Sequence, residues 1–146
     1  MTGKAYDEIS IGQTFSASLT VTETHIVQGS GLFGDFNPLH VNEEYCKSTS
    51  FETRILHGPL TSALMSAPIG NYFAGTAIAY LEHNCRFLKP VKANDTLTTV
   101  WTIAGKLDKP KHNGGIAVLS ATCHNQNKVS VAEAEGKILL MNRLTK

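Results

Sequence analysis

The segment that begins at Gly58 most restricts how this chain can fold. Gly58 and Pro59 are a strong helix start, because a proline at the first helical position gives up an N–H that would be unpaired anyway. Apolar and small residues then continue around the predicted helix: Leu60, Ala63, Leu64, Ala67 and Ile69. A helix with this pattern is buried on most of its sides. Pro68 is expected to kink or end it, since its ring clashes with the carbonyl of Leu64 and it has no N–H.

Four stretches of alternating apolar and polar residues follow this helix and predict four consecutive strands. They are residues 80–87, 97–105, 116–124 and 129–141, with a polar loop at 106–114 and a hairpin turn at 125–127. A Thr- and Ser-rich stretch at residues 11–22 predicts an earlier extended segment. Together these elements indicate an α+β domain, with an antiparallel sheet wrapped around a central helix. A single sheet leaves part of that helix uncovered, which favours a second copy of the chain completing the burial.

Composition places residues 1–146 in a single domain and excludes several classes of partner. The chain has 13 basic and 12 acidic residues, so its net charge of +1 gives no general reason to bind nucleic acid or an anionic membrane. No apolar run approaches the ~20 residues that span a bilayer, and the polar N-terminus lacks the features of a signal peptide. Cys46, Cys85 and Cys123 are odd in number and far apart, which favours reduced thiols. We therefore expect a cytoplasmic protein.

Asp35 and His40 are the first candidates for chemistry. Pro38 stands between them and prevents a continuing helix, because it lacks an N–H and biases Asn37 toward an extended conformation. The chain must turn there, and the turn can aim a carboxylate and an imidazole at one water, as general acid–base catalysis requires. The alternative is a capped turn in which Asp35 bonds its own backbone. Spacing alone leaves both interpretations open.

Other patterns in the sequence have ordinary structural explanations. Residues 29–34 match the G-x-G-x-x-G pattern of a dinucleotide-binding loop, but they fall in a predicted helix capped by Thr22 or Thr24 instead of joining a strand to a helix. Glycines that allow close packing are the favoured interpretation. His57 is interpreted as a helix-capping or core histidine. The remaining histidines have no metal-site spacing; they are His25, His83, His112 and His124.

Residues 34–40, followed by residues 57–58, resemble the hydratase motif of the MaoC-like dehydratases, a family that includes the (R)-specific enoyl-CoA hydratases. An acid, an Asn-Pro turn and a histidine all stand at the family's spacing. The similarity extends from about residue 11 to residue 140, nearly the whole chain, and residues 87–91 look like one of the family's strands. The resemblance implies a hotdog fold, which agrees with the sheet and helix predicted above.

The resemblance also implies roles for particular residues. Asp35 and His40 would be the catalytic pair. Ser66 is placed like the serine that hydrogen-bonds the catalytic aspartate, and Asn37 would also orient the pair. Gly58 would supply the backbone N–H of an oxyanion hole. Because the next residue is a proline without an N–H, this hole would depend on Gly58 and on the positive end of the helix.

The activity implied by the resemblance is that of a homodimeric enzyme, or a higher homo-oligomer, that reversibly hydrates trans-2-enoyl thioesters to (R)-3-hydroxyacyl thioesters. Its substrate would be a small-molecule acyl thioester carried by coenzyme A or an acyl-carrier protein, with no metal or redox cofactor. Lys109, Lys111 and Arg86 are candidates for the carrier's phosphates. Ile69, Tyr72 and Phe73 add bulk after Pro68, which predicts a preference for short enoyl chains of about four to six carbons. A hotdog thioesterase and a non-catalytic acyl-binding module remain the alternatives, and which member of the pair is the base stays open.

Overall fold

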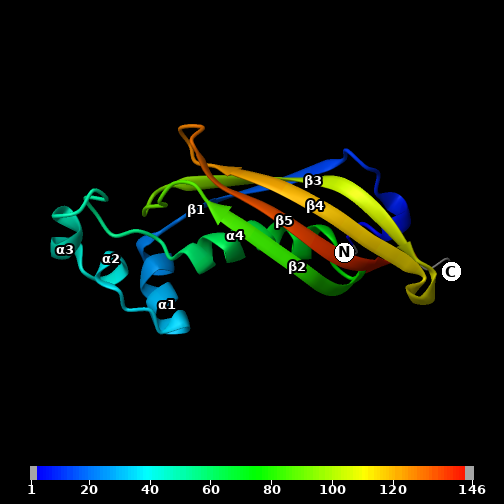
Figure 1. Ribbon diagram of the computed structural model, residues 1–146, viewed down its shortest axis with the longest axis horizontal. Coiled ribbons are helices and arrows are strands. Elements are labelled where there is room, and N and C mark those ends of the chain that lie inside the picture. The colour runs from blue at the N-terminus through cyan, green and yellow to red at the C-terminus, as the bar shows by residue number, and fades with distance from the viewer. Residues whose placement is uncertain (1–2, 144–146) are drawn as a thin grey trace.

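A five-stranded antiparallel sheet curves around helix α4 (Gly58–Tyr72) in the computed structural model, which describes residues 3–143 (Figure 1). The strands are β1 (Thr14–Thr20), β2 (Ala77–Phe87), β3 (Thr96–Lys109), β4 (Gly114–His124) and β5 (Ser130–Met141). They lie in the order β1-β3-β4-β5-β2, so β1 and β2 form the two edges. The predicted α+β architecture, an antiparallel sheet around a central helix, is confirmed.

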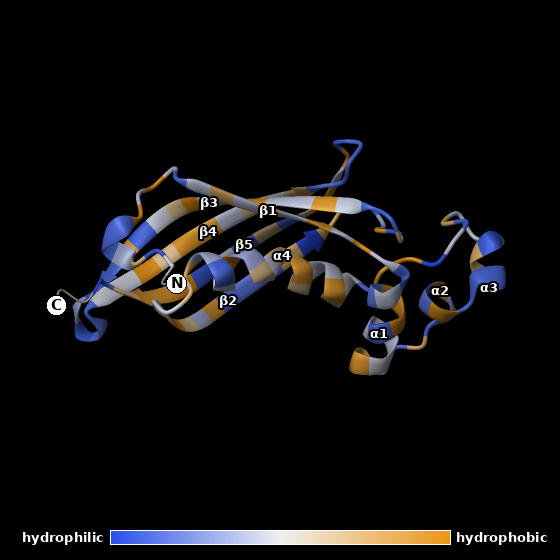
Figure 2. Ribbon diagram, turned by 180° about the vertical axis from the view of Figure 1, so that it is seen from behind, coloured by the Kyte–Doolittle hydropathy of each residue, from blue (hydrophilic) through white to orange (hydrophobic). Residues whose placement is uncertain are grey.

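Helix α4 presses one side against the sheet and leaves the other side uncovered (Figure 2). Met65 and Ile69 are buried in the core, and removing a side chain of this size from water contributes about 1.5–3 kcal/mol. The indole Nε1 of Trp101, on β3, donates to the Met65 carbonyl at 2.8 Å. Ala63 and Ala67 on the opposite side are exposed. The expected burial on most sides is therefore not reached within one chain.

Pro68 does not end α4, contrary to one of the two outcomes expected for it. The helix continues through this proline to Tyr72. Proline removes the backbone hydrogen bond to the Leu64 carbonyl, while the Trp101 indole anchors the same turn by donating to the next carbonyl, that of Met65. Burial of Pro68 itself also offsets the loss. α4 is the longest helix at 15 residues, and no helix within residues 3–143 is long and apolar enough to cross a bilayer.

Three shorter helices extend beyond one end of the sheet (Figures 1 and 2). They are α1 (Glu23–Phe33), α2 (Pro38–Val41) and α3 (Glu43–Lys47). Two predicted caps are confirmed. Thr22 is the N-cap residue of α1, and the Asn42 side chain accepts from the Tyr45 N–H at 2.9 Å to cap α3. We refer to α1, α2 and α3 as the overhang.

Strand β3 is longer than predicted, because the polar residues interpreted as a loop continue the strand to Lys109. A register shift between Ile103 and Gly105 interrupts the alternation there. Beyond it, Lys106 Nζ donates to the Tyr6 carbonyl at 2.8 Å, and the Tyr6 hydroxyl donates to Asp108 at 2.7 Å. The N-terminal segment, including a short 3-10 helix η1 (Tyr6–Glu8), therefore satisfies the polar side chains of this half of the strand. Of the predicted loop, η2 (Pro110–His112) and Asn113 lie outside the strands.

Candidate active site

The turn between α1 and α2 holds Asp35 on the overhang. Gly34 caps the C-terminus of α1; its positive φ of 70° favours glycine, and its N–H donates to the Ser30 carbonyl at 2.9 Å. Asp35 Oδ1 accepts from the Asn37 N–H at 3.1 Å, and the Asn37 side chain in turn caps α2 at 3.0 Å. One oxygen of Asp35 therefore makes the capped turn that was the alternative interpretation. The other oxygen faces His40.

The side chains of Asp35 and His40 converge at this turn. Asp35 Oδ2 lies 3.7 Å from His40 Nε2, too far for a direct hydrogen bond but a separation that one water can bridge. The second ring nitrogen of His40, Nδ1, lies 2.8 Å from the Ile55 carbonyl. A carbonyl only accepts, so Nδ1 carries a hydrogen, and in the neutral ring Nε2 then presents a lone pair. The carboxylate is 50% exposed and the imidazole 12% exposed, and both offer acceptors to the same point.

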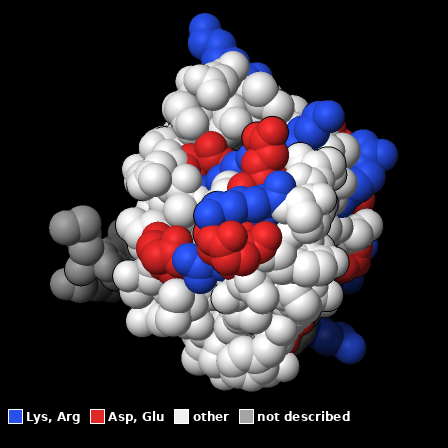
Figure 3. Space-filling view, turned by 90° about the vertical axis from the view of Figure 1, so that its left-hand side faces the viewer, with Lys and Arg blue, Asp and Glu red and all other residues white. Residues whose placement is uncertain are grey.

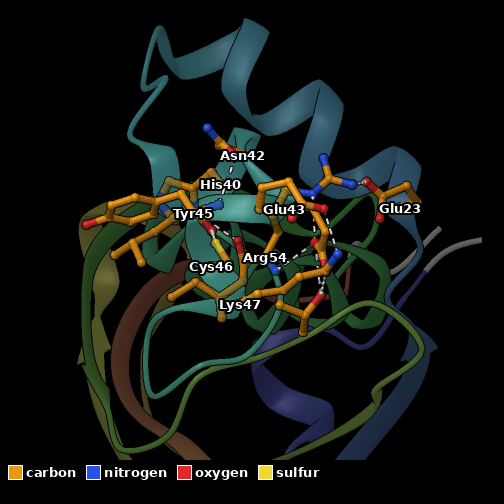
Figure 4. Close-up of polar contacts among 12 residues, drawn as sticks. Glu23, His40, Asn42, Glu43, Tyr45, Cys46, Lys47 and Arg54 are labelled. Carbon is orange, nitrogen blue, oxygen red and sulfur yellow. Dashed lines mark hydrogen bonds and ion pairs between the residues drawn. The ribbon is translucent and has the colours of Figure 1, made fainter.

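Arg54 fixes the segment that carries the Ile55 carbonyl (Figure 4). Its guanidinium pairs with Glu23 on α1 and, through Nε at 3.3 Å, with Glu43 on α3. Two hydrogen bonds to the Glu43 carboxylate hold its pKa below the usual range. The larger effect comes from the Thr53 hydroxyl and the next from the Arg54 N–H. Basic and acidic side chains intermix at the centre of this end of the molecule (Figure 3). The ion pairs join α1, α3 and the loop before α4 into one support for His40.

His57 immediately precedes α4 and is fully buried. Its ring stacks on that of His40, with centroids 3.7 Å apart and planes inclined by 26°. Its Nε2 lies 3.1 Å from the Asp35 carbonyl. The interpretation of His57 as a core histidine is confirmed, but sequence reasoning missed that it contacts both members of the pair. Its position next to Gly58 was the only signal in the sequence.

Asp35, His40 and His57 place potential metal-ligand atoms within 4.8 Å of one another. Ring nitrogens direct their lone pairs in the plane of the ring, so two stacked rings point them side by side instead of at a common centre. The Nε2 of His57 is also engaged by the Asp35 carbonyl. A shared metal ion would require both rings to turn. One water between Asp35 and His40 requires no movement.

Gly58 begins α4 next to this cluster. The first N–H groups of an α-helix have no partner within the helix, and the helix dipole makes this end positive. A Cβ on Gly58 would lie 3.1 Å from the Phe87 ring, so that ring would have to give way by a few tenths of an ångström to admit a side chain. Gly58 lines a mainly apolar cavity of about 310 Å³ together with Phe51, Thr61 and Leu88. The helix terminus, with its N–H groups that lack helical partners, therefore lies at this cavity.

Ser66 lies two turns further along α4 and lines a different cavity. Its Oγ donates to the Ala63 carbonyl at 2.8 Å, and within residues 3–143 of one chain it makes no hydrogen bond to Asp35. This second cavity has a volume of about 270 Å³ and is also lined by Gly70 and Tyr80. Ser66 and Asp35 are thus not brought together within a single chain.

The bulk expected beyond Pro68 mostly faces the core. Tyr72 stacks on Phe15 with ring centroids 4.0 Å apart, and Phe73 is fully buried. Of the three bulky residues expected to limit the acyl chain, only Ile69 lines the cavity beside Ser66. Two of the three side chains on which the predicted preference for short acyl chains depended therefore do not line this cavity.

The basic residues proposed to contact the carrier's phosphates lie apart from the pair. Lys109 ends β3 and Lys111 lies in η2, at the opposite end of the molecule from the overhang (Figure 1). Arg86 is largely exposed and pairs with Glu133. One chain alone does not bring these residues to the site.

The antiparallel sheet around α4 defines a hotdog-type domain. Its Asp–His pair, on the overhang beside the N-terminus of α4, is suited to proton transfer to and from water. The MaoC like domain matches residues 7–123, and the chain belongs to this family, the MaoC-like dehydratases. The (R)-specific enoyl-CoA hydratase of Rhodospirillum rubrum is 34% identical over 138 residues, which cover 94% of this chain and 92% of that protein.

Solved structures agree with the fold. An (R)-hydratase of Pseudomonas aeruginosa, in its unliganded form, matches with a TM-score of 0.84 and 29% identity, covering 97% of this chain and 92% of that chain. A Mycobacterium tuberculosis protein with a double hotdog fold matches with a TM-score of 0.87 and 20% identity, covering 99% of this chain and 46% of that chain. The predicted hotdog fold is confirmed.

Proposed function

We propose that this protein is a hydro-lyase that reversibly adds water to trans-2-enoyl thioesters and forms (R)-3-hydroxyacyl thioesters. The observation that carries the proposal is the 3.7 Å separation of Asp35 Oδ2 and His40 Nε2, two acceptors directed at one point. Family membership and the relative named (R)-specific enoyl-CoA hydratase support the same reaction. Asn37 supports the pair indirectly, because its side chain caps the helix that carries His40.

In the proposed mechanism one water donates its two hydrogens to Asp35 Oδ2 and His40 Nε2. Its oxygen attacks the β-carbon of the enoyl thioester while one of the two groups accepts a proton. Because both groups begin as acceptors, the proton taken from the water is the one available for the α-carbon. The enoyl substrate thus gains a hydroxyl at the β-carbon and a hydrogen at the α-carbon, and Asp35 and His40 return to their starting protonation states.

The Gly58 N–H is proposed to stabilise the negative charge that conjugate addition places on the thioester oxygen. A fixed donor at the positive end of a helix is suited to this task, since it needs no reorganisation as the charge develops. Its location in the lining of the 310 Å³ cavity supports binding of the thioester group there. The 270 Å³ cavity beside Ser66 is the proposed location of the acyl tail.

The reaction adds water without net oxidation or reduction, so we propose that it needs no redox cofactor, and that Asp35 and His40 activate the water in place of a metal ion. Coenzyme A or an acyl-carrier protein would be part of the substrate. The three cysteines are all unpaired, which supports a reducing, cytoplasm-like compartment.

We also propose a homodimer joined along the β2 edge. An open edge presents unpaired backbone groups to another strand. Large apolar side chains are exposed along this strand: Ile78, Tyr80, Leu81 and Phe87. A second copy would cover them and the exposed side of α4, as a two-fold assembly of identical surfaces requires.

The test is an assay with crotonyl-CoA that follows the enone absorbance, thiol release and the chirality of the product. We expect the absorbance to fall without thiol release and the product to be the (R)-3-hydroxyacyl thioester. Release of thiol would identify a thioesterase. Tight binding of acyl-CoA without either change would identify a binding module.

A further inference from the structure

We infer that His57 is a positioning residue for the Asp35–His40 pair, and that Gly29 on α1 is the position that admits its ring. His57 is fully buried and contacts the backbone of one member of the pair and the side chain of the other. The inference deepens the proposed hydration and rests on it.

The contact with Asp35 is made through the backbone. His57 Nε2 lies 3.1 Å from the Asp35 carbonyl and 3.4 Å from the Ser30 hydroxyl. The carbonyl only accepts, so Nε2 carries the hydrogen. This bond fixes the main chain at the residue whose carboxylate must meet the water. It adds to the Asn37 N–H bond, which fixes only the Oδ1 side of the carboxylate.

The contact with His40 is made through the ring face. The two imidazoles stack at 3.7 Å, while the Ile55 carbonyl bonds the His40 Nδ1 at 2.8 Å. A ring held on one face and at one nitrogen has little freedom to rotate. The direction of the His40 Nε2 lone pair therefore depends on where the His57 ring lies.

Gly29 lies against the Nδ1–Cε1 edge of the His57 ring. A Cβ at this position would lie 2.7 Å from His57 Nδ1 and 3.1 Å from Cε1, so a methyl group there would displace the ring. Gly31, two residues along the same helix, has no atom within 4 Å of a Cβ. The expectation that these glycines allow close packing is therefore confirmed for Gly29 and wrong for Gly31.

The chemistry of the ring favours positioning over simple core filling. His57 Nδ1 is buried and has no hydrogen-bond partner among residues 3–143. A buried polar atom without a partner is destabilising, and an apolar ring of similar size would avoid that loss. Histidine at this place is explained by the use of its Nε2–H on the Asp35 carbonyl.

The experiment compares Gly29→Ala with its matched control Gly31→Ala. We expect Gly29→Ala to lower kcat for crotonyl-CoA hydration by roughly tenfold to a hundredfold, the size of effect seen when catalytic groups move by a fraction of an ångström to one ångström. KM should change by no more than about twofold, as should both constants of Gly31→Ala. In substrate-free protein, the imidazole NMR signals of His40 should shift in Gly29→Ala only.

A second pair of variants separates the two contacts and remains informative if Gly29→Ala does not fold. His57→Phe keeps a stacked ring but removes the donor to Asp35, and His57→Gln keeps a donor near the Nε2 position. We expect His57→Phe to lose roughly tenfold or more in kcat and His57→Gln to recover part of it. In a His57→Phe and Asp35→Asn double variant, kcat should fall no further than in Asp35→Asn alone, because a positioning residue acts through the pair.

Wild-type kcat and unshifted His40 signals in both Gly29→Ala and His57→Phe would overturn the inference. An inactive wild-type protein would instead contradict the proposed function. In that case the His40 signals still decide whether Gly29 and His57 position the ring.

Discussion

The proposed reaction depends most directly on Asp35 and His40 acting on one water, which Asp35→Asn and His40→Gln test. Asparagine keeps an oxygen for the Asn37 N–H, so the turn that accepts this bond at 3.1 Å is preserved. What the variant loses is the charged acceptor that faces His40 Nε2 at 3.7 Å. The glutamine variant removes the ring and its lone pair.

We expect each single variant to lose roughly two to four orders of magnitude in kcat, the usual contribution of a general acid or base. This corresponds to about 2.7–5.5 kcal/mol of transition-state stabilisation at ~1.36 kcal/mol per decade. If the two groups acted independently, their losses in log kcat would add, and the double variant would lose roughly four to eight orders of magnitude in kcat. Because one water between the two atoms requires both of them, we expect the double variant to be little worse than either single variant.

The measurement is the initial rate of enone loss with crotonyl-CoA for wild type, both single variants and the double variant. His112→Gln is the control, since this histidine is exposed on η2, far from the overhang. Far-UV circular dichroism and thermal unfolding establish that each variant is folded. A single variant with near-normal activity would remove that residue from the mechanism. Fully additive losses would refute the shared water.

Three further results are expected. Light scattering at micromolar concentration should give twice the 15.8 kDa of one chain, because the β2 edge and one side of α4 are uncovered; a mass near one chain would contradict the dimer. Arg54→Met should lower stability by about 1 kcal/mol, and the difference from wild type should shrink in high salt, since the lost pairs with Glu23 and Glu43 are partly exposed. Gly70→Leu should lower kcat/KM for longer enoyl-CoAs about fourfold per excluded methylene at ~0.8 kcal/mol each, with crotonyl-CoA little affected. Gly70 suits this test because it lines the 270 Å³ cavity and no atom lies within 4 Å of a Cβ there. Equal effects on all chain lengths would exclude this cavity as the acyl site.

The features that the sequence predicted are those with local causes. Gly58 and Pro59 start α4 because helix initiation depends on a few adjacent residues. Asn42 caps α3 for the same reason. The Asn37-Pro38 turn brings Asp35 and His40 together because the chain has little freedom between them. Such features require no knowledge of the rest of the fold.

The features that the sequence did not predict depend on partners far along the chain. Lys106 and Asp108 look like loop residues until the N-terminal segment bonds them, so β3 was predicted too short. Pro68 looks like a helix end until the Trp101 indole is placed beside the turn that it weakens. His57 looks like an ordinary core histidine because its contacts come from α1, α2 and the turn between them. No pattern in one sequence pairs residues across such distances.

The exposure of Asp35 connects the proposed assembly to the proposed chemistry. Its carboxylate is 50% exposed, although a fixed donor and a positioned base act most strongly where bulk water is excluded. Its neighbours Leu32 and Phe36 are apolar and 77% and 64% exposed. Large apolar side chains exposed on either side of Asp35 in the sequence are expected to be covered in the working state, and a second chain on the open side of α4 is the available cover. Dilution should therefore lower the activity per chain over the same concentration range in which the mass falls to that of one chain. Constant activity across that range would show that the pair works without cover.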